Sequence, residues 1–100
     1  MKVVALALLA ALCGVAHSAT AVVNAVPTNW KIESYVAGGS VVLWFTGSPC
    51  ASGKLELPSG ASATDHNRLF TSVLTAKTAG KTMVIFYEDT TCVISSFGVQ

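Results

Sequence analysis

One stretch decides the fold: residues Trp30 to Thr46 read WKIESYVAGGSVVLWFT. Its first half alternates apolar and polar side chains, as a half-buried strand does, and its second half is rich in β-branched and aromatic residues. Between the halves, Gly38 and Gly39 tolerate the positive φ angles of a two-residue turn. The stretch therefore predicts an antiparallel hairpin.

A two-residue turn at Gly38 and Gly39 also sets the register of this hairpin. On one face the predicted pairs are Val36 with Val41, Ser34 with Leu43, and Ile32 with Phe45. The other face carries two aromatic residues, Tyr35 and Trp44, among polar neighbours, a setting that suits sugar stacking or contact with a protein. The alternative is that the helix or the N-terminal arm covers this face and both aromatics belong to the core. Tyr35 and Trp44 are the candidate ligand or partner surface.

One helix and three further strands are predicted downstream. A short strand, 54–57, precedes a helix capped by Thr64 or Asp65 and stopped by Gly80. Strands over 82–87 and 92–97 are apolar on both faces, which favours the middle of a small barrel or burial against a second subunit. The fold class is therefore α+β and β-rich, a small five-stranded antiparallel barrel or sheet with one helix, in the order β-β-β-α-β-β.

Residues 1–18 have the pattern of a signal peptide. Lys2 precedes an apolar stretch too short for the roughly 20 residues of a membrane-spanning helix, and small residues favour cleavage after Ser18 or Ala21. The organisation predicted is this leader, an irregular arm over 19–29, and a single domain over 30–100. The mature chain is expected to be secreted or periplasmic, with no membrane span.

Export indicates that the cysteines form disulfides, because thiols pair in an oxidising compartment. Cys13 leaves with the leader, so Cys50 and Cys92 have only each other and predict a structural disulfide. The alternative, a metal site or a catalytic thiol, lacks further ligands at short spacing. No metal or cofactor is predicted.

Charge excludes one class of partner. The whole sequence is 52% hydrophobic and 11% charged, with six basic and five acidic residues. Without Lys2 the mature chain is neutral, so it lacks the basic surface that nucleic-acid binding needs.

Sequence gives little support for catalysis. His66 is the only histidine beyond the leader, and no Gly-x-Ser-x-Gly motif accompanies it. Because neighbours at a helix start do not face one another, His66 is predicted to be a solvated residue of the first turn. The chain is predicted not to be an enzyme, and a small hydrolase that uses His66 is the remote alternative.

From residue 69 the chain carries LFTSVLTAKTAGK followed by TMVIFY. This run resembles the helix, helix stop and following strand of the B subunits of subtilase-type and typhoid-type bacterial toxins. The resemblance implies an OB-like five-stranded barrel, a homo-oligomer of five subunits, and binding of sialylated or other glycans on host cells. The cysteines are placed differently here, and the family's glycan contacts lie outside the matching run, so neither is carried over.

Two functions follow as hypotheses. The first is a secreted or periplasmic bacterial binding protein, similar to a toxin B subunit, whose ligand is a host glycan or a protein. The second is a stand-alone secreted or envelope accessory or inhibitor protein with no sugar site.

Overall fold

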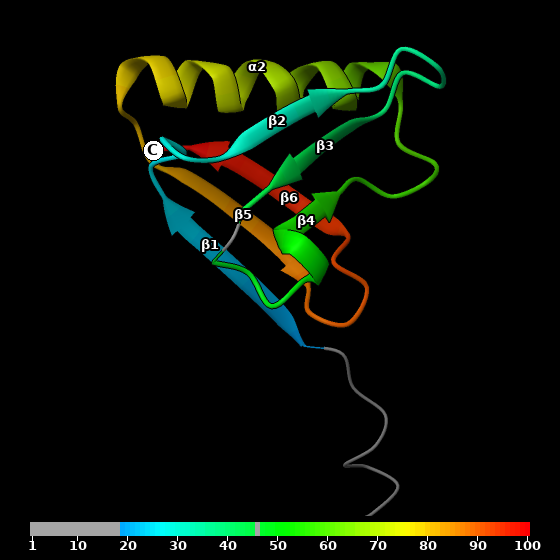
Figure 1. Ribbon diagram of the computed structural model, residues 1–100, viewed down its shortest axis with the longest axis horizontal. Helices are drawn as coiled ribbons and strands as arrows, with labels where there is room; N and C mark the ends of the chain where they lie inside the picture. Colours follow the sequence, from blue (N-terminus) through cyan, green and yellow to red (C-terminus); the bar gives the residue numbers. More distant parts are fainter. Residues whose placement is uncertain (1–18, 46) are drawn as a thin grey trace, which may run out of the picture.

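A computed structural model of the chain describes residues 19–45 and 47–100. They form two three-stranded antiparallel sheets and a long helix (Figure 1). One sheet has the order β1 (Thr20–Ala25), β5 (Met83–Glu88) and β6 (Ile94–Val99). The other consists of β2 (Lys31–Ser34), β3 (Val41–Trp44) and β4 (Lys54–Glu56), with the 3-10 turn η1 (Ala51–Gly53) before β4 and helix α2 (Ala63–Ala79) after it. The predicted leader, residues 1–18, lies outside the described residues.

The α+β class and the predicted order of elements are confirmed, but the closed five-stranded barrel is wrong. The two sheets meet at one parallel bridge, between Glu56 and Val93, where the Glu56 N–H donates to the Cys92 carbonyl at 3.3 Å. Pairing stops there because Pro58, two residues on, has no N–H to donate. The sheets consequently diverge beyond the bridge.

The irregular arm predicted over 19–29 contains a strand. β1 pairs with β5 along its whole length, from Thr20 opposite Glu88 to Ala25 opposite Met83, and Val23 is buried. Only the end of the arm is irregular: the Thr28 N–H donates to the Val26 carbonyl at 2.9 Å in a tight turn before β2. The strand escaped prediction because its partner lies far away in the sequence.

The first hairpin forms, with a register that differs by two residues from the predicted one. Ser34 lies opposite Val41, because a four-residue turn replaces the two-residue turn and the Tyr35 N–H donates to the Ser40 carbonyl at 2.8 Å. A shift of two residues keeps every side chain on its predicted face. The longer turn places Lys31 directly opposite Trp44, where the Lys31 ammonium lies 5.6 Å from the ring centroid in an attractive contact.

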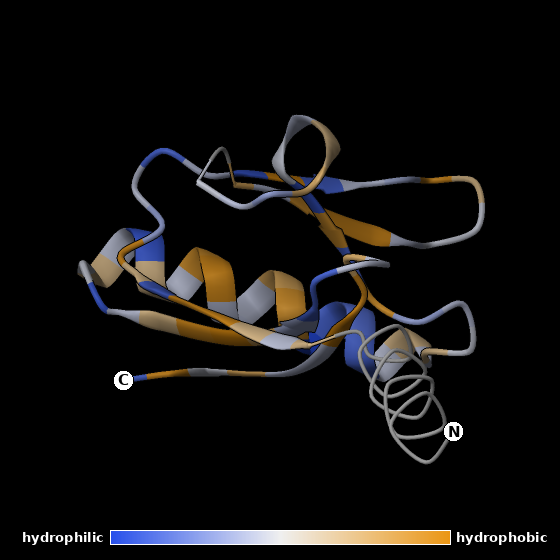
Figure 2. Cartoon of the chain, turned by 90° about the horizontal axis from the view of Figure 1, so that it is seen from below, coloured by the Kyte–Doolittle hydropathy of each residue, from blue (hydrophilic) through white to orange (hydrophobic). Residues whose placement is uncertain are grey.

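The cap of helix α2 is Ser62, which precedes the predicted caps Thr64 and Asp65. The Ser62 hydroxyl accepts the Asp65 N–H at 3.1 Å and the Asp65 carboxylate accepts the Ser62 N–H at 3.4 Å, a reciprocal capping box. Gly80 ends the helix in the left-handed conformation, as predicted. Figure 2 shows orange and pale segments alternating along the helix, as expected of an amphipathic one. None of the helices in the described part of the chain has the length and apolar character needed to cross a membrane.

The core lies between the two sheets and the helix. Its buried side chains come from every strand except β2, from one side of α2, and from the residues just before β2 and just after β4: Val23, Trp30, Val41, Leu43, Leu55, Leu57, Leu69, Val73, Ala76, Met83, Ile85, Tyr87 and Ile94. At the edge of this core the predicted disulfide is present, with the Cα atoms of Cys50 and Cys92 6.1 Å apart. It joins the loop before β4 to the loop before β6, beside the single bridge between the sheets.

Candidate functional site

The sheet β2–β3–β4 turns one face away from the core, and this face carries both candidate aromatic residues. Side chains alternate across a strand, so Leu43 and Leu55 point inward while their neighbours point outward. We call the outward side the outer face; it comprises Lys31, Glu33, Tyr35, Ser40, Val42, Trp44, Lys54 and Glu56. Neither Tyr35 nor Trp44 belongs to the core cluster. Tyr35 is exposed and Trp44 half-buried, whereas Val42 on the same face is only 1% exposed.

Trp44 stands in the middle strand between two lysines. Lys31 on β2 and Lys54 on β4 lie directly opposite it, with their ammonium groups 5.6 and 5.8 Å from the ring centroid. The indole N–H donates to the Glu33 carboxylate at 3.2 Å. The ring is thereby held half-buried in a fixed orientation, and a ligand that stacks on it must move one flexible lysine aside.

Tyr35 is 40% exposed, and its hydroxyl bonds to the same carboxylate. The Tyr35 hydroxyl, followed by the Trp44 indole and Lys31, holds the pKa of Glu33 below its usual value. Glu33 in turn raises the pKa of Tyr35, and the negative charge of Glu56 adds to this effect. The carboxylate that accepts the Trp44 indole N–H thus also interacts with the Tyr35 side chain.

The charges on the outer face balance. Lys31 pairs with Glu33 at 3.6 Å and Lys54 with Glu56 at 3.9 Å, and all four side chains are substantially exposed. Exposed ion pairs of this kind contribute little to stability, typically about 0–1 kcal/mol. Their weakness leaves the lysines and carboxylates available to exchange partners with hydroxyl or amide groups of a ligand.

The Glu33–Tyr35 hydrogen bond gives a prediction for titration. The bond should be intact between the ordinary pKa values of glutamate, 4.5, and tyrosine, 10.0. It should be lost when pH falls through the lowered pKa of Glu33 and the carboxylate is protonated, or when pH rises through the raised pKa of Tyr35 and the hydroxyl is deprotonated. Glu33→Gln should move the Tyr35 pKa down toward 10.0, measured by NMR titration of ¹³C-labelled tyrosine. Glu56→Gln, which acts only through space, should move it less. An unchanged Tyr35 titration in Glu33→Gln would contradict the assigned bond.

His66 is not the solvated residue that the sequence predicts. Its Nδ1 accepts the backbone N–H of Val41 at 3.0 Å, and the side chain is partly buried. The Val41 N–H is available to His66 because β4 ends at Glu56, opposite Val42, and does not extend far enough to pair with Val41. His66 thus fastens the first turn of α2 to the start of β3.

This hydrogen bond determines what His66 can do chemically. With Nδ1 as acceptor, the neutral ring carries its proton on Nε2, which is then a donor. A catalytic histidine in a serine hydrolase holds the opposite tautomer, with Nδ1 donating and Nε2 accepting. The remote hydrolase hypothesis therefore loses support from the geometry. Within residues 19–45 and 47–100, no cluster of three histidine, cysteine or carboxylate side chains could hold a metal ion.

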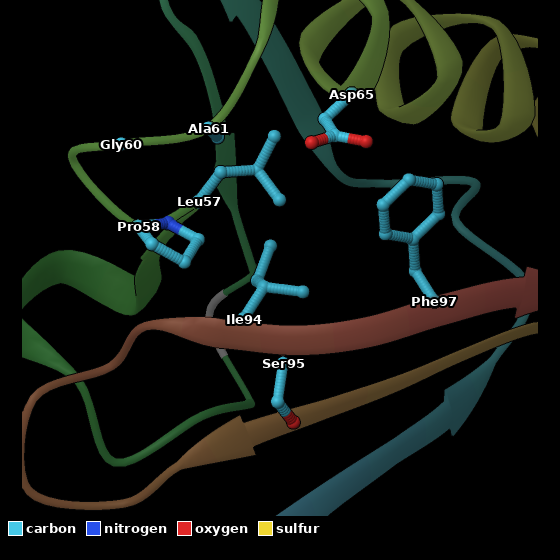
Figure 3. A pocket seen from close by; sticks show the side chains of 8 residues that line it. All are labelled: Leu57, Pro58, Gly60, Ala61, Asp65, Ile94, Ser95 and Phe97. Atoms are coloured by element: carbon cyan, nitrogen blue, oxygen red, sulfur yellow. The ribbon is translucent and has the colours of Figure 1, made fainter.

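A cavity of about 320 Å³ opens where β4 and β6 diverge. Figure 3 shows Leu57 and Ile94 facing Phe97 across it, with the Asp65 carboxylate above them. That carboxylate already serves the helix cap. The cavity thus follows from the divergence of the two sheets, with mostly apolar walls and a structural acid at its rim.

The outward side of the other sheet carries an apolar patch. Val22 on β1 and Phe86 on β5 pair directly and are 53% and 41% exposed. Such a patch is the kind of surface that a protein partner or a second subunit covers.

No protein-family model, curated protein or solved structure matches the chain.

Proposed function

We propose that the chain is an exported, non-catalytic binding protein that holds a glycan on its outer face. The observation that carries this proposal is the pair of aromatic side chains, Tyr35 and Trp44, held by Glu33 outside the core of a small domain. Aromatic faces supply the stacking surface for a sugar ring, and the surrounding charged groups supply donors and acceptors for its hydroxyls. The disulfide supports export, because such bonds persist in oxidising compartments.

The strand order supports an OB-like interpretation of the fold. If β1 and β2 are taken as two halves of one interrupted strand, the chain has five strands and one helix between the third and fourth. The parallel bridge between Glu56 and Val93 then links the third strand to the fifth. OB folds are partly open barrels that bind oligosaccharides among other ligands. A homo-oligomer, five-membered by the resemblance, belongs to the same proposal, and the exposed Val22 and Phe86 support it.

Replacing Trp44 with alanine tests the site. The oxidised protein is applied to a glycan array, and the glycans that bind are titrated against the wild type, Trp44→Ala and Tyr35→Ala. We expect each variant to weaken binding at least about tenfold, because stacking on an aromatic ring is lost. Truncating a buried aromatic side chain lowers the free energy of unfolding by about 3–5 kcal/mol. We expect each of these two variants to lose roughly half of that.

Two results would overturn the proposal. If the wild type binds no glycan on the array, the result would favour the accessory or inhibitor protein with no sugar site. Unchanged glycan binding by both variants would place any sugar site elsewhere. Thr75→Ala, an exposed change on the far helix surface, is the matched control and should leave both binding and stability as they are.

A further inference from the structure

A second cavity adjoins the outer face at the point where β4 leaves β3. Its volume is about 290 Å³, at the lower end of the range for small-molecule sites. It is lined by Ser40, Val41, Val42, Glu56, Leu57, Pro58, Ser59 and His66. Ser40, Val42 and Glu56 also belong to the outer face, so the cavity continues the surface that carries Trp44.

The cavity exists because a strand pair is interrupted. Glu56 is the last residue of β4 to pair with β3, opposite Val42, and the chain then turns away at Pro58. His66 extends from the helix into the space beside Val41, and its Nδ1 accepts a hydrogen bond from the Val41 N–H at 3.0 Å. The His66 side chain thus bonds the Val41 N–H at the end of the sheet and also forms one wall of the cavity.

The polar groups of the cavity are both donors and acceptors. With Nδ1 of His66 committed to Val41, its Nε2–H is the group left to meet a ligand, and no hydrogen bond from it is found among the described residues. Glu56 supplies a carboxylate acceptor, and Ser40 and Ser59 supply hydroxyls that serve either way. Pro58 supplies exposed apolar surface, and the buried Val42 and Leu57 lie behind it in the lining.

We propose that this cavity binds one uncharged sugar ring of the glycan whose remainder lies along the outer face near Trp44. The inference rests on the proposed function and adds the class of ring and its position. A sugar ring presents hydroxyls that both donate and accept, together with an apolar C–H face, and the cavity offers partners for each. An anionic ring is disfavoured, because its carboxylate would meet the Glu56 carboxylate, whose charge the exposed Lys54 at 3.9 Å offsets only in part.

The test uses two substitutions at His66 that separate its two nitrogens. In His66→Asn the amide oxygen stands at the position of Nδ1, so the Val41 N–H keeps an acceptor while the Nε2–H donor is removed. His66→Ala removes both. The probes are the methyl glycosides of galactose, glucose, mannose and N-acetylglucosamine, with N-acetylneuraminic acid as the anionic comparison, each titrated against ¹⁵N-labelled wild-type protein by NMR.

We expect at least one neutral glycoside to shift the amide signals of Ser40, Val42 and Ser59. His66→Asn should weaken that glycoside about tenfold, the usual effect of one lost hydrogen bond, while its spectrum and melting temperature stay close to wild type. Thr64→Ala, an exposed change two residues before His66 and outside the cavity lining, should bind as the wild type does.

The outcomes distinguish the cavity from the outer face as a whole. If glycosides shift the Trp44 and Lys54 signals but not those of the cavity, or if His66→Asn binds as tightly as the wild type, the cavity proposal is wrong and the outer-face proposal stands. Preference of the cavity for N-acetylneuraminic acid would also overturn it. If no probe and no arrayed glycan shifts any signal, both proposals fail together.

Discussion

Replacing Cys50 and Cys92 together with alanine should lower the free energy of unfolding by about 4 kcal/mol, the estimate for a disulfide that closes a loop of this length. The two cysteines are 42 residues apart in sequence, so the crosslink removes much of the freedom of the unfolded chain. In the folded state the bond lies beside the only bridge between the two sheets in the described part of the chain. Urea unfolding followed by circular dichroism measures the loss.

Reduction of the wild type supplies the control for this pair of substitutions. The reduced wild type and Cys50→Ala/Cys92→Ala should unfold at similar urea concentrations, because each lacks the same crosslink. A loss below about 1 kcal/mol in both would show that the core alone holds the two sheets together. Such a result would contradict the stapling role given to the disulfide.

Trp30→Ala should cost about 3–5 kcal/mol, the range for truncating a buried aromatic side chain. Trp30 is only 6% exposed, and its ring contacts Phe45 with the ring centroids 5.0 Å apart. Its carbonyl also accepts the Lys77 ammonium of helix α2 at 2.7 Å. The residue therefore joins the turn after β1 to the core and to the helix.

Trp44→Ala is the matched control, since both variants remove the same side chain. Trp30 lies in the core and Trp44 on the outer face, so the two losses in stability should differ by at least about 1.5 kcal/mol in chemical denaturation. Acrylamide should quench the fluorescence of Trp44, measured in Trp30→Phe, more than that of Trp30, measured in Trp44→Phe. Equal losses would mean that Trp44 is a core residue and would remove the basis of the proposed site.

Local pattern in the sequence was sufficient for the faces of the first hairpin, the helix and the disulfide. Strand alternation has a period of two, so Tyr35 and Trp44 were placed on the correct side even though the turn is longer than predicted. The helix stop at Gly80 is a local effect of backbone conformation and was predicted for the same reason. The two cysteines beyond the predicted leader allow only one pairing.

Contacts between distant segments could not be predicted in this way. β1 is a strand because it pairs with β5, where Val23 lies opposite Ile85. The sequence around Val23 does not indicate that partner. The role of His66 depends on an N–H that β4 leaves unpaired at Val41, which requires the ends of three elements to be known together. The same is true of the cavity beside it.

The pairing of β1 with β5 has a kinetic consequence. The first strand of the described chain forms its hydrogen bonds with a strand near the other end, Thr20 with Glu88 and Ala25 with Met83. Until β5 has been synthesised, β1 has no partner, and closing so long a loop slows folding. An emerging chain with this topology therefore cannot complete the sheet β1–β5–β6 until most of its residues have been synthesised.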